Sequence, residues 1–392
     1  MNYKPLAIAF IFISVVGCSS SSEVLGTSDT SRNTTTSTQF ENTGTSISQG
    51  TSERPQQDED FSTPPTLPST DLDETNNSRQ ALTPTTLSAA ESNPVIVPKP
   101  DADVAQLCAS LGVTSSETIE SPDLTEISGA AWTSDGVWVH NDAGNPAELH
   151  LIASPNSENS GELLRTINLE GQTDSPILDA EDITVIDGDL LLADTGNNVA
   201  DGGRDFVQLI RVNTTTEQVV GTFRYQFPNG SGDVEAIIYD PVDSLVYLIQ
   251  KARTDGITSS IAGPATIYSA RLTSTEEPTE LNIVGQIDLG PETLQSEGEI
   301  HPNREGQLLG IITAADISSD GSAIAIRTYD SAWIYQRQSG QSVVQALQTV
   351  PCEAPTNPEP QGEAIAFNTT SNQIELATIS ESSNQPINVI TQ

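Results

Sequence analysis

Residues 234–249 read VEAIIYDPVDSLVYLI: an acidic residue with an apolar run, a turn, and a second apolar run. β-Branched and aromatic residues on both sides of the Asp-Pro-Val-Asp turn predict a hairpin of two short strands. Four other stretches have the same plan. Their first strands are expected to begin at Ile127, Ala180, Ala315 and Gly362, and their second strands at Val137, Leu190, Ala323 and Ile374. The chain therefore contains an internal repeat of hairpins.

Further apolar runs predict a third and a fourth strand in most of these units. The starts of the five units are separated by 53, 54, 81 and 47 residues. Four short antiparallel strands in a unit of this size are typical of a propeller blade. We therefore predict that residues 105–392 form an all-β domain, a β-propeller of five four-stranded blades. The alternative count is six, with a degenerate blade around the insertion at residues 291–310 in the longest unit.

The first 18 residues predict an export signal. Lys4 precedes an apolar run, Leu6 to Val16, that is too short to span a bilayer. The small residues before Cys18 resemble a bacterial lipobox, which implies that Cys18 is acylated and becomes the new N-terminus. A plain secretory signal is the alternative. Ser19 after the cysteine favours the outer membrane by the same resemblance, so we expect a lipid-anchored protein of the cell envelope whose anchor binds the membrane.

Residues 19–104 predict a disordered linker that acts as a stalk. They are rich in Ser, Thr, Asp and Pro and nearly free of aromatic residues, so they cannot bury enough apolar surface to offset the entropy cost of ordering. The whole chain has 15 basic and 54 acidic residues, a formal net charge of −39. Because binding to nucleic-acid phosphates needs clustered Lys and Arg, this composition excludes a nucleic-acid partner of that kind.

The two ends of the domain are expected to meet. The last unit lacks a fourth strand, and residues 117–119 can supply one from the N-terminal side, which closes the ring and removes open sheet edges. The fourth strand of the unit before it is expected at residues 343–350. Cys108 and Cys352 lie near the two ends, and an isolated cysteine pair in an exported domain predicts a disulfide. Two buried free thiols are the alternative.

Several motifs together resemble a known kind of protein. They are Trp138-Val139-His140-Asn141-Asp142, Glu181-Asp182-Ile183, Asp194-Thr195-Gly196-Asn197-Asn198 and Asp233-Val234-Glu235-Ala236-Ile237. Their succession resembles a family of exported bacterial β-propeller proteins of unassigned function, and it is similar to propellers grouped as SdiA-regulated or phytase-esterase-like. The resemblance covers most of residues 124–367. It implies the fold, and a fold does not determine an activity.

Acidic residues at the unit starts are candidate metal ligands. The first strand of a propeller blade lines the central axis, so these carboxylates are expected to converge there. They are Glu181, Glu235, Asp316 and Glu363. Oxygen ligands without soft donors suit Ca²⁺ or Mg²⁺ better than Zn²⁺. The alternative is that these carboxylates cap strand ends by accepting backbone N–H groups.

Polar residues near the ends of the second strands are candidates for contact with a ligand. They are Asn141, Asp142, Asp194, Asn197, Lys251 and Arg327. For the Asn and Asp residues the alternative is a turn stabilised by their own side chains. The two cations are expected to pair with axis carboxylates or to bind an anionic ligand. His140 is the one histidine beside a candidate loop, and it is either a general base or a plain strand residue.

These observations support three functions. The first is a non-enzymatic lipoprotein whose propeller binds a protein or small-molecule ligand at its face or acidic axis, with Ca²⁺ as the cation. The second is a Ca²⁺-dependent hydrolase, lactonase-like or phosphoesterase-like, in which axis carboxylates hold the ion and His140 is the base. The third is a structural component of the cell surface. The sequence leaves open whether the domain is an enzyme.

Overall fold

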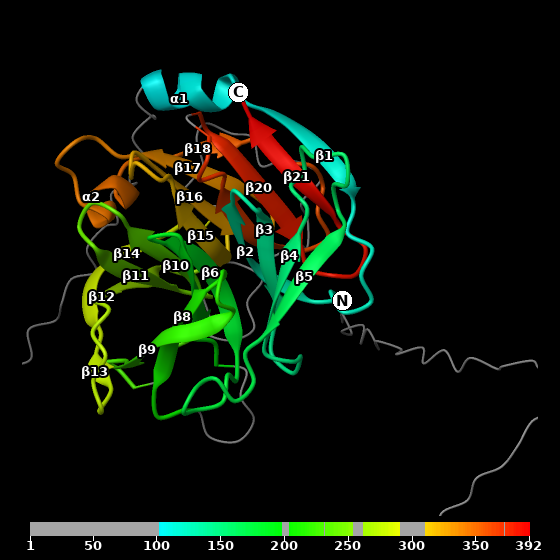
Figure 1. Ribbon diagram of the computed structural model, residues 1–392. Helices are drawn as coiled ribbons and strands as arrows, with labels where there is room; N and C mark the ends of the chain where they lie inside the picture. The colour runs from blue at the N-terminus through cyan, green and yellow to red at the C-terminus, as the bar shows by residue number, and fades with distance from the viewer. Residues whose placement is uncertain (1–101, 198–203, 231, 254–261, 291–309, 372) are drawn as a thin grey trace, which may run out of the picture. The chain divides into compact units, whose positions relative to one another are not determined.

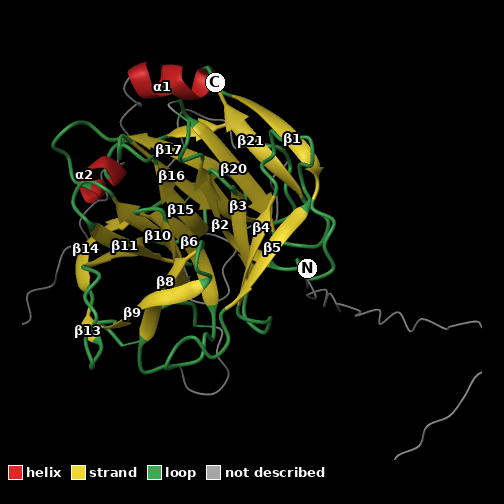
Figure 2. Ribbon diagram, viewed as in Figure 1, coloured by secondary structure: helices red, strands yellow, loops and turns green. Residues whose placement is uncertain are grey.

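The computed structural model describes residues 102–197, 204–230, 232–253, 262–290, 310–371 and 373–392. In this part of the chain the strands form five sheets arranged in a ring (Figures 1 and 2). The prediction of an all-β propeller with five blades is confirmed. The predicted export signal, Cys18 and the linker up to residue 101 lie outside the described residues, as do residues 291–309 of the insertion. No helix within the described ranges is long and apolar enough to cross a bilayer.

Each blade begins with the strand nearest the axis and proceeds outward. Blade 1 contains β2 (Ile127–Thr133), β3 (Gly136–Asn141), β4 (Glu148–Ile152) and β5 (Leu163–Asn168). Blade 2 contains β6 (Ala180–Ile186), β7 (Asp189–Asp194), β8 (Val207–Asn213) and β9 (Gln218–Gln226), with β13 (Thr279–Glu280) added in parallel to β9. Blade 3 contains β10 (Val234–Asp240), β11 (Leu245–Gln250), β12 (Ala265–Ala270) and β14 (Asn282–Ile287).

The last two blades hold the C-terminal part of the chain. Blade 4 contains β15 (Ile312–Ile317), β16 (Ala323–Thr328), β17 (Ala332–Gln336) and β18 (Cys352–Ala354). Blade 5 contains β19 (Gly362–Phe367), β20 (Glu375–Ser380), β21 (Pro386–Thr391) and β1 (Gly112–Thr118). The inner strands contact one another in the cyclic order β2, β6, β10, β15, β19 and back to β2. This order closes the ring around an axis.

The N-terminal part of the domain completes the last blade. Strand β1 pairs antiparallel with β21, with Gly112 opposite Thr391 and Thr118 opposite Pro386 (Figure 1). The expected closure from the N-terminal side is therefore confirmed, but the closing strand covers residues 112–118 and not 117–119. The predicted disulfide is also present: Cys108 of α1 (Ala102–Ala109) is bonded to Cys352 of β18. The helix α1 starts inside the segment that the sequence predicts as linker.

One predicted strand is wrong. Residues 343–350 contain the short helix α2 (Val343–Leu347) instead of a strand, and β18 follows it. A capping box explains the helix: the Ser342 hydroxyl accepts the Gln345 N–H, and the Gln345 side chain accepts the Ser342 N–H. Two otherwise orphan donors of the first turn are thus satisfied, which favours the helix over an apolar strand.

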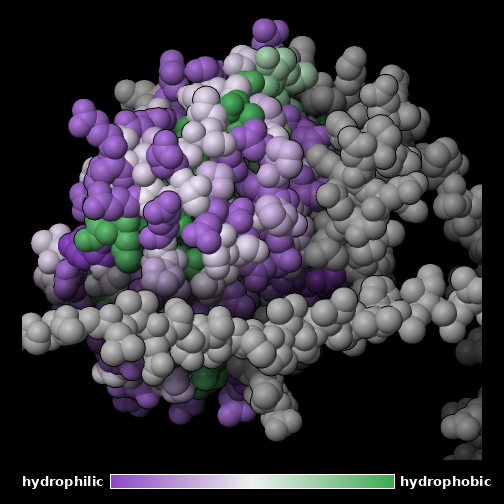
Figure 3. Space-filling model, turned by 90° about the vertical axis from the view of Figure 1, so that its right-hand side faces the viewer, coloured by the Kyte–Doolittle hydropathy of each residue, from purple (hydrophilic) through white to green (hydrophobic). Residues whose placement is uncertain are grey.

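The hydrophobic core lies between the blades. Each of the five largest buried clusters joins two neighbouring sheets; Trp132 and Ile127 of blade 1, for example, pack with Ala364 and Ile379 of blade 5. Burial of one Val, Leu, Ile or Phe side chain contributes about 1.5–3 kcal/mol, so the ring is held mainly by these interfaces. The face drawn in Figure 3 is mostly polar, with apolar side chains in small separate areas.

Candidate functional site

Each inner strand carries a β-bulge next to its first residue. The strand pairing slips by one residue there, and the extra residues are Ser128, Glu181, Glu235, Thr313 and Glu363. A bulge redirects the side chain of the extra residue. Because the five strands have equivalent positions in a closed ring, the bulges lie at one end of the axis. Three glutamates that the sequence selected are thus brought to the same end, and all three are buried.

A second set of equivalent residues surrounds the same end. Each directly follows the second strand of its blade and donates its N–H to the carbonyl of the residue before the inner strand, over 2.8–3.2 Å. These residues are Asp142, Thr195, Lys251, Tyr329 and Glu381. We call the five bulge residues, these five residues and the five residues that directly precede the inner strands the acidic end of the ring. Asp142 and Lys251, both selected from the sequence, belong to it.

Two groups of three carboxylates occur at the acidic end, and both contain Glu181. Oxygens of Asp142, Asp179 and Glu181 lie within 4.8 Å of one another, and so do oxygens of Glu181, Asp233 and Glu235. Asp179 and Asp233 are not among the candidate ligands selected from the sequence. A signal was available, because each immediately precedes an inner strand in the repeat, where the loop faces the same end.

The Glu181 carboxylate has an oxygen without a hydrogen-bond partner. Oε2 accepts a long bond, 3.4 Å, from the Ser128 hydroxyl, whereas Oε1 has none among the described residues. The side chain is only 2% exposed, so water does not solvate it freely. A Cβ on residue 196 would overlap both Glu181 Oε1 and Asp179 Oδ2, so only glycine lets the backbone pass this close to the two oxygens. A buried carboxylate oxygen without a hydrogen-bond partner is a position that a cation or a water can occupy.

The acidic end strongly perturbs its carboxyl groups. Burial raises the pKa of Glu181 well above its ordinary value, and the nearby Glu235 and Asp142 raise it further. Burial raises the pKa of Glu235 to about 7, although Lys251 acts in the opposite direction. Burial and Glu235 likewise raise the pKa of Glu363. Without a cation, ionised carboxylates are therefore costly here, and a divalent cation would remove that cost.

Lys251 is the basic residue of the acidic end. Its Nζ lies 2.8 Å from Glu235 Oε1 and 5.3 Å from the centre of the Tyr329 ring. Burial alone would lower the pKa of Lys251, but the charges of Glu235 and Glu363 raise it above its ordinary value, so the side chain is an ammonium. The sequence-based expectation that Lys251 pairs with an axis carboxylate agrees with this contact.

Asp316 does not occupy a bulge position. Thr313 does so in blade 4, and Asp316 lies three residues further along β15. Its carboxylate accepts the Thr184 hydroxyl over 3.0 Å and the Phe367 N–H over 2.8 Å. These bonds join blade 4 to blades 2 and 5. Asp316 therefore matches the alternative in which a carboxylate caps a strand end by accepting a backbone N–H. It belongs to neither of the two carboxylate groups that contain Glu181.

Asp182 plays a similar part and was not selected from the sequence. Its Oδ2 accepts the N–H groups of Ile237, over 2.8 Å, and Ala315, over 3.2 Å, so one carboxylate ties blade 2 to blades 3 and 4. The equivalent residues of the other inner strands are all small: Gly129, Ala236, Ala314 and Ala364. The sequence therefore contains a pattern that marks Asp182: the other four inner strands have a small residue at the position where β6 has this Asp.

Of the three remaining loop candidates, two use their side-chain polar atoms inside the protein. Asn141 accepts the Glu126 N–H and donates to the Asp123 carbonyl, so it fixes the loop before β2. Asp194 forms an ion pair of 2.8 Å with Arg204 and also accepts from Gln208. Asn197 is exposed, and its backbone N–H donates to Asp233 over 3.1 Å. Asp194 also accepts the N–H of Asp179 over 2.9 Å, so it fixes the residue before β6, and Asn141 fixes the loop opposite Asp142.

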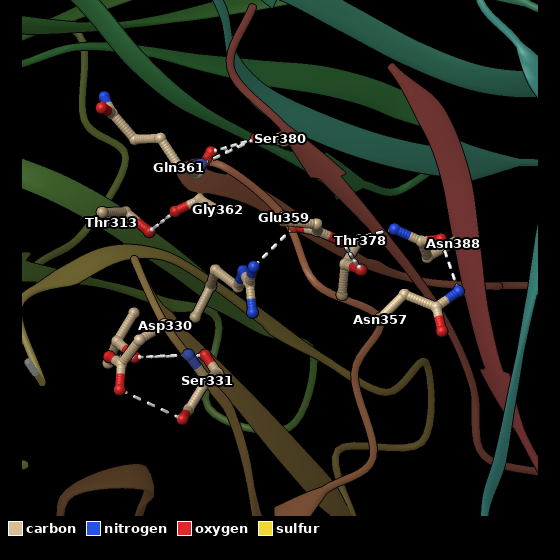
Figure 4. A network of polar contacts seen from close by, with 12 residues as sticks. Thr313, Asp330, Ser331, Asn357, Glu359, Gln361, Gly362, Thr378, Ser380 and Asn388 are labelled. Carbon is tan, nitrogen blue, oxygen red and sulfur yellow. Dashed lines mark hydrogen bonds and ion pairs between the residues drawn. The ribbon is translucent and has the colours of Figure 1, made fainter. Parts of the chain in front are cut away.

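His140 and Arg327 occupy equivalent interior positions in blades 1 and 4. His140 is 2% exposed, its Nδ1 donates to the Asn141 carbonyl over 3.1 Å, and burial lowers its pKa to about 4. Arg327 forms an ion pair of 2.5 Å with Glu359. Figure 4 shows Glu359 beside Thr378 and Asn388, whose side chains both donate to it over 2.6 Å. This network connects the inner part of blade 4 to blade 5.

The donor set of the acidic end suits a hard cation. Asp142, Asp179 and Glu181 supply carboxylate oxygens only, with no sulfur or imidazole among the grouped atoms. Ca²⁺ takes about six to eight oxygen ligands in flexible geometry, and Mg²⁺ demands a tighter octahedron. Asp142 is half-buried, which leaves one side for water or an oxygen-bearing ligand. The arrangement can bind a cation and present it at the surface.

Comparisons with known proteins show no family for this chain. No protein-family model matches the chain, and no curated protein matches its sequence. Among solved structures, glutaminyl cyclase of Myxococcus xanthus is 12% identical, with a TM-score of 0.41 over 71% of this chain and 96% of that one. A Trichoderma reesei carbohydrate-active enzyme of family AA12 is 10% identical, with a TM-score of 0.41 over 72% and 96%. Hydrazine synthase of Kuenenia stuttgartiensis is 10% identical, with a TM-score of 0.35 over 67% and 71%.

These similarities are distant and carry no argument about what this chain binds. The five-bladed propeller that the resemblance implies is shown by the five sheets of the structure, and no protein-family model matches the chain.

Proposed function

We propose that the propeller binds one divalent, oxygen-preferring cation, Ca²⁺ above all, at the acidic end of the ring. Asp142, Asp179 and Glu181 are the proposed ligands. The observation that carries the proposal is the buried Glu181 Oε1, which lacks a hydrogen-bond partner within the described residues and lies within 4.8 Å of the other two carboxylates. Asp182 and Asp316 show the contrast: both oxygens of each carboxylate accept hydrogen bonds from the protein.

In this proposal the propeller is the ligand-binding domain of a cell-envelope lipoprotein, and the bound cation contacts the ligand. Cleavage and acylation at Cys18, as the lipobox resemblance implies, would attach the chain to the outer membrane, and the linker would carry the propeller away from it. The ligand would be a protein or small molecule that offers an oxygen to the cation on the half-buried Asp142 side. Replacing Cys18 by Ala is expected to abolish incorporation of a labelled fatty acid and to release the protein from the membrane fraction.

The Ca²⁺-dependent hydrolase is the second interpretation. It needs a base that reaches a substrate near the cation. His140, the base indicated by the sequence, is only 2% exposed and lies against Gly129 in the interior of blade 1. Nothing in its surroundings favours that role. Turnover of a lactone or phosphoester that disappears in both Glu181→Gln and His140→Ala, with Ca²⁺ still required, would restore this interpretation.

Thermal melting with EDTA, Mg²⁺ and Ca²⁺ tests the proposed function on residues 19–392. A ligand at 100 times its Kd stabilises the folded state by about 2.7 kcal/mol, which corresponds to a rise of about 5 °C or more in a domain of this size. Glu181→Gln is expected to remove the Ca²⁺ effect. The matched control is Glu363→Gln, because Glu363 occupies the equivalent bulge of blade 5 and also has a buried oxygen, Oε2, without a hydrogen-bond partner in the described part of the chain, but belongs to neither carboxylate group. This variant should keep the Ca²⁺ effect, and a wild-type chain that Ca²⁺ leaves unchanged would contradict the proposal.

A further inference from the structure

The two carboxylate groups that share Glu181 differ in how they are neutralised. In the group of Glu181, Asp233 and Glu235, an ammonium is already present, because Lys251 Nζ lies 2.8 Å from Glu235 Oε1. In the group of Asp142, Asp179 and Glu181, neither Asp142 nor Glu181 forms an ion pair with a Lys or Arg of the described segments. The group of Glu181, Asp233 and Glu235 therefore already contains a cation, the ammonium of Lys251.

Lys251 is held in this position from several sides. Its N–H donates to the Asp233 carbonyl over 2.8 Å, which fixes the backbone beside the second carboxylate group. Its ammonium lies 5.3 Å from the Tyr329 ring centre, where the negative face of an aromatic ring attracts a cation. The side chain is 13% exposed, and its partner Glu235 is 3% exposed. The pair is thus a built feature of the site and not a loose surface contact.

We propose that Lys251 is a tethered counter-ion that occupies the second cation position, so that the propeller binds one divalent cation and not two. This inference rests on the proposed function. Without Lys251, the groups would form two adjacent sites bridged by Glu181, the arrangement that binds paired metal ions in many proteins. With Lys251, a second dication would have to displace the ammonium from Glu235 and would be repelled by it. The cation is thereby directed to Asp142, Asp179 and Glu181.

The stoichiometry of Ca²⁺ binding tests this inference. Isothermal titration of residues 19–392 is expected to give one Ca²⁺ for the wild type and two for Lys251→Met, whose side chain has similar length and no charge. Lys251→Arg keeps the cation and should bind one. Arg211→Met is the matched control: it also removes one positive charge, from the 2.7 Å ion pair with Asp189 at the other end of β7, and should bind one.

Glu235→Gln provides a second variant in case Lys251→Met does not fold. Because Glu235 is the partner of Lys251 and not a ligand of the single cation, this variant should still bind one Ca²⁺. Its affinity is expected to be about tenfold or more weaker, since the freed ammonium can approach Glu181. Two Ca²⁺ ions on the wild type, one on a folded Lys251→Met variant, or none on Glu235→Gln would overturn the inference. No Ca²⁺ on the wild type would instead overturn the proposed function itself.

Discussion

Removal of the Cys108–Cys352 disulfide is expected to destabilise the propeller by about 3–5 kcal/mol. The bond joins residues separated by 244 positions, from the helix before β1 to the last strand of blade 4. For a loop of this length, the loss of chain entropy in the unfolded state corresponds to about 5 kcal/mol at 25 °C. Because β1 pairs with β21 independently of the bond, we expect the ring to stay closed in the native state of the variant.

Urea unfolding, followed by the fluorescence of the buried Trp132 and Trp138, measures this effect. The double variant Cys108→Ser with Cys352→Ser should show a lower midpoint than the oxidised wild type. The single variant Cys108→Ser should match the double variant, because both lack the cross-link. A loss below about 1 kcal/mol would refute the view that the bond restrains the whole unfolded ring, and so would a single variant with wild-type stability.

Three further outcomes follow from the carboxylates. Burial raises the pKa of Glu235 from 4.5 to about 7, so the folded chain binds more protons than the unfolded chain between these pH values. In EDTA the free energy of unfolding, and with it the melting temperature, should fall as pH rises from 5 to 8. Glu235 alone contributes about 3 kcal/mol to this fall. Saturating Ca²⁺ should flatten the pH dependence, and a rise of stability with pH would contradict the assignment. Asp182→Ala leaves inter-blade N–H groups unpaired, so urea unfolding should show a loss of about 3 kcal/mol or more with the Ca²⁺ stoichiometry unchanged; a neutral effect would disprove the axial role. Gly196→Ala should weaken Ca²⁺ binding at least about tenfold by calorimetry, because the new Cβ would overlap Glu181 and Asp179, whereas Gly112→Ala, whose Cβ meets no atom within 4 Å, should not; equal affinities would count against this place for the cation.

The fold was largely predictable because the same hairpin recurs with the same burial. Inner strands such as β10 and β19 are buried on both faces, so they appear in the sequence as short continuous apolar runs. The closure by β1 followed from the missing fourth strand of the last unit. The helix α2 was not predictable from the apolar residues 343–350, because the capping pair Ser342 and Gln345 decides between helix and strand locally.

The candidate site was predictable where the repeat was read in the correct register. Glu181, Glu235 and Glu363 came from equivalent unit starts, and they lie at one end of the axis. The fourth unit begins at Ile312 and not at Ala315, since its bulge residue is a threonine; an acid-based alignment therefore placed Asp316 three residues out of step. The positions of Asp179 and Asp233 directly before inner strands follow from the repeat, but their distances to Glu181 depend on how the neighbouring blades pack around the axis.

The central claim is that Glu181, Asp142 and Asp179 hold a divalent cation, and a crystal structure grown with Ca²⁺ tests it most directly. Anomalous scattering would locate the ion without reference to any assumed activity. We expect one calcium peak at the acidic end, with Glu181 Oε1 and oxygens of Asp142 and Asp179 at about 2.3–2.6 Å from it and Lys251 still paired with Glu235. A fully occupied water at that position in saturating Ca²⁺, or a calcium bound elsewhere on the ring, would contradict the account.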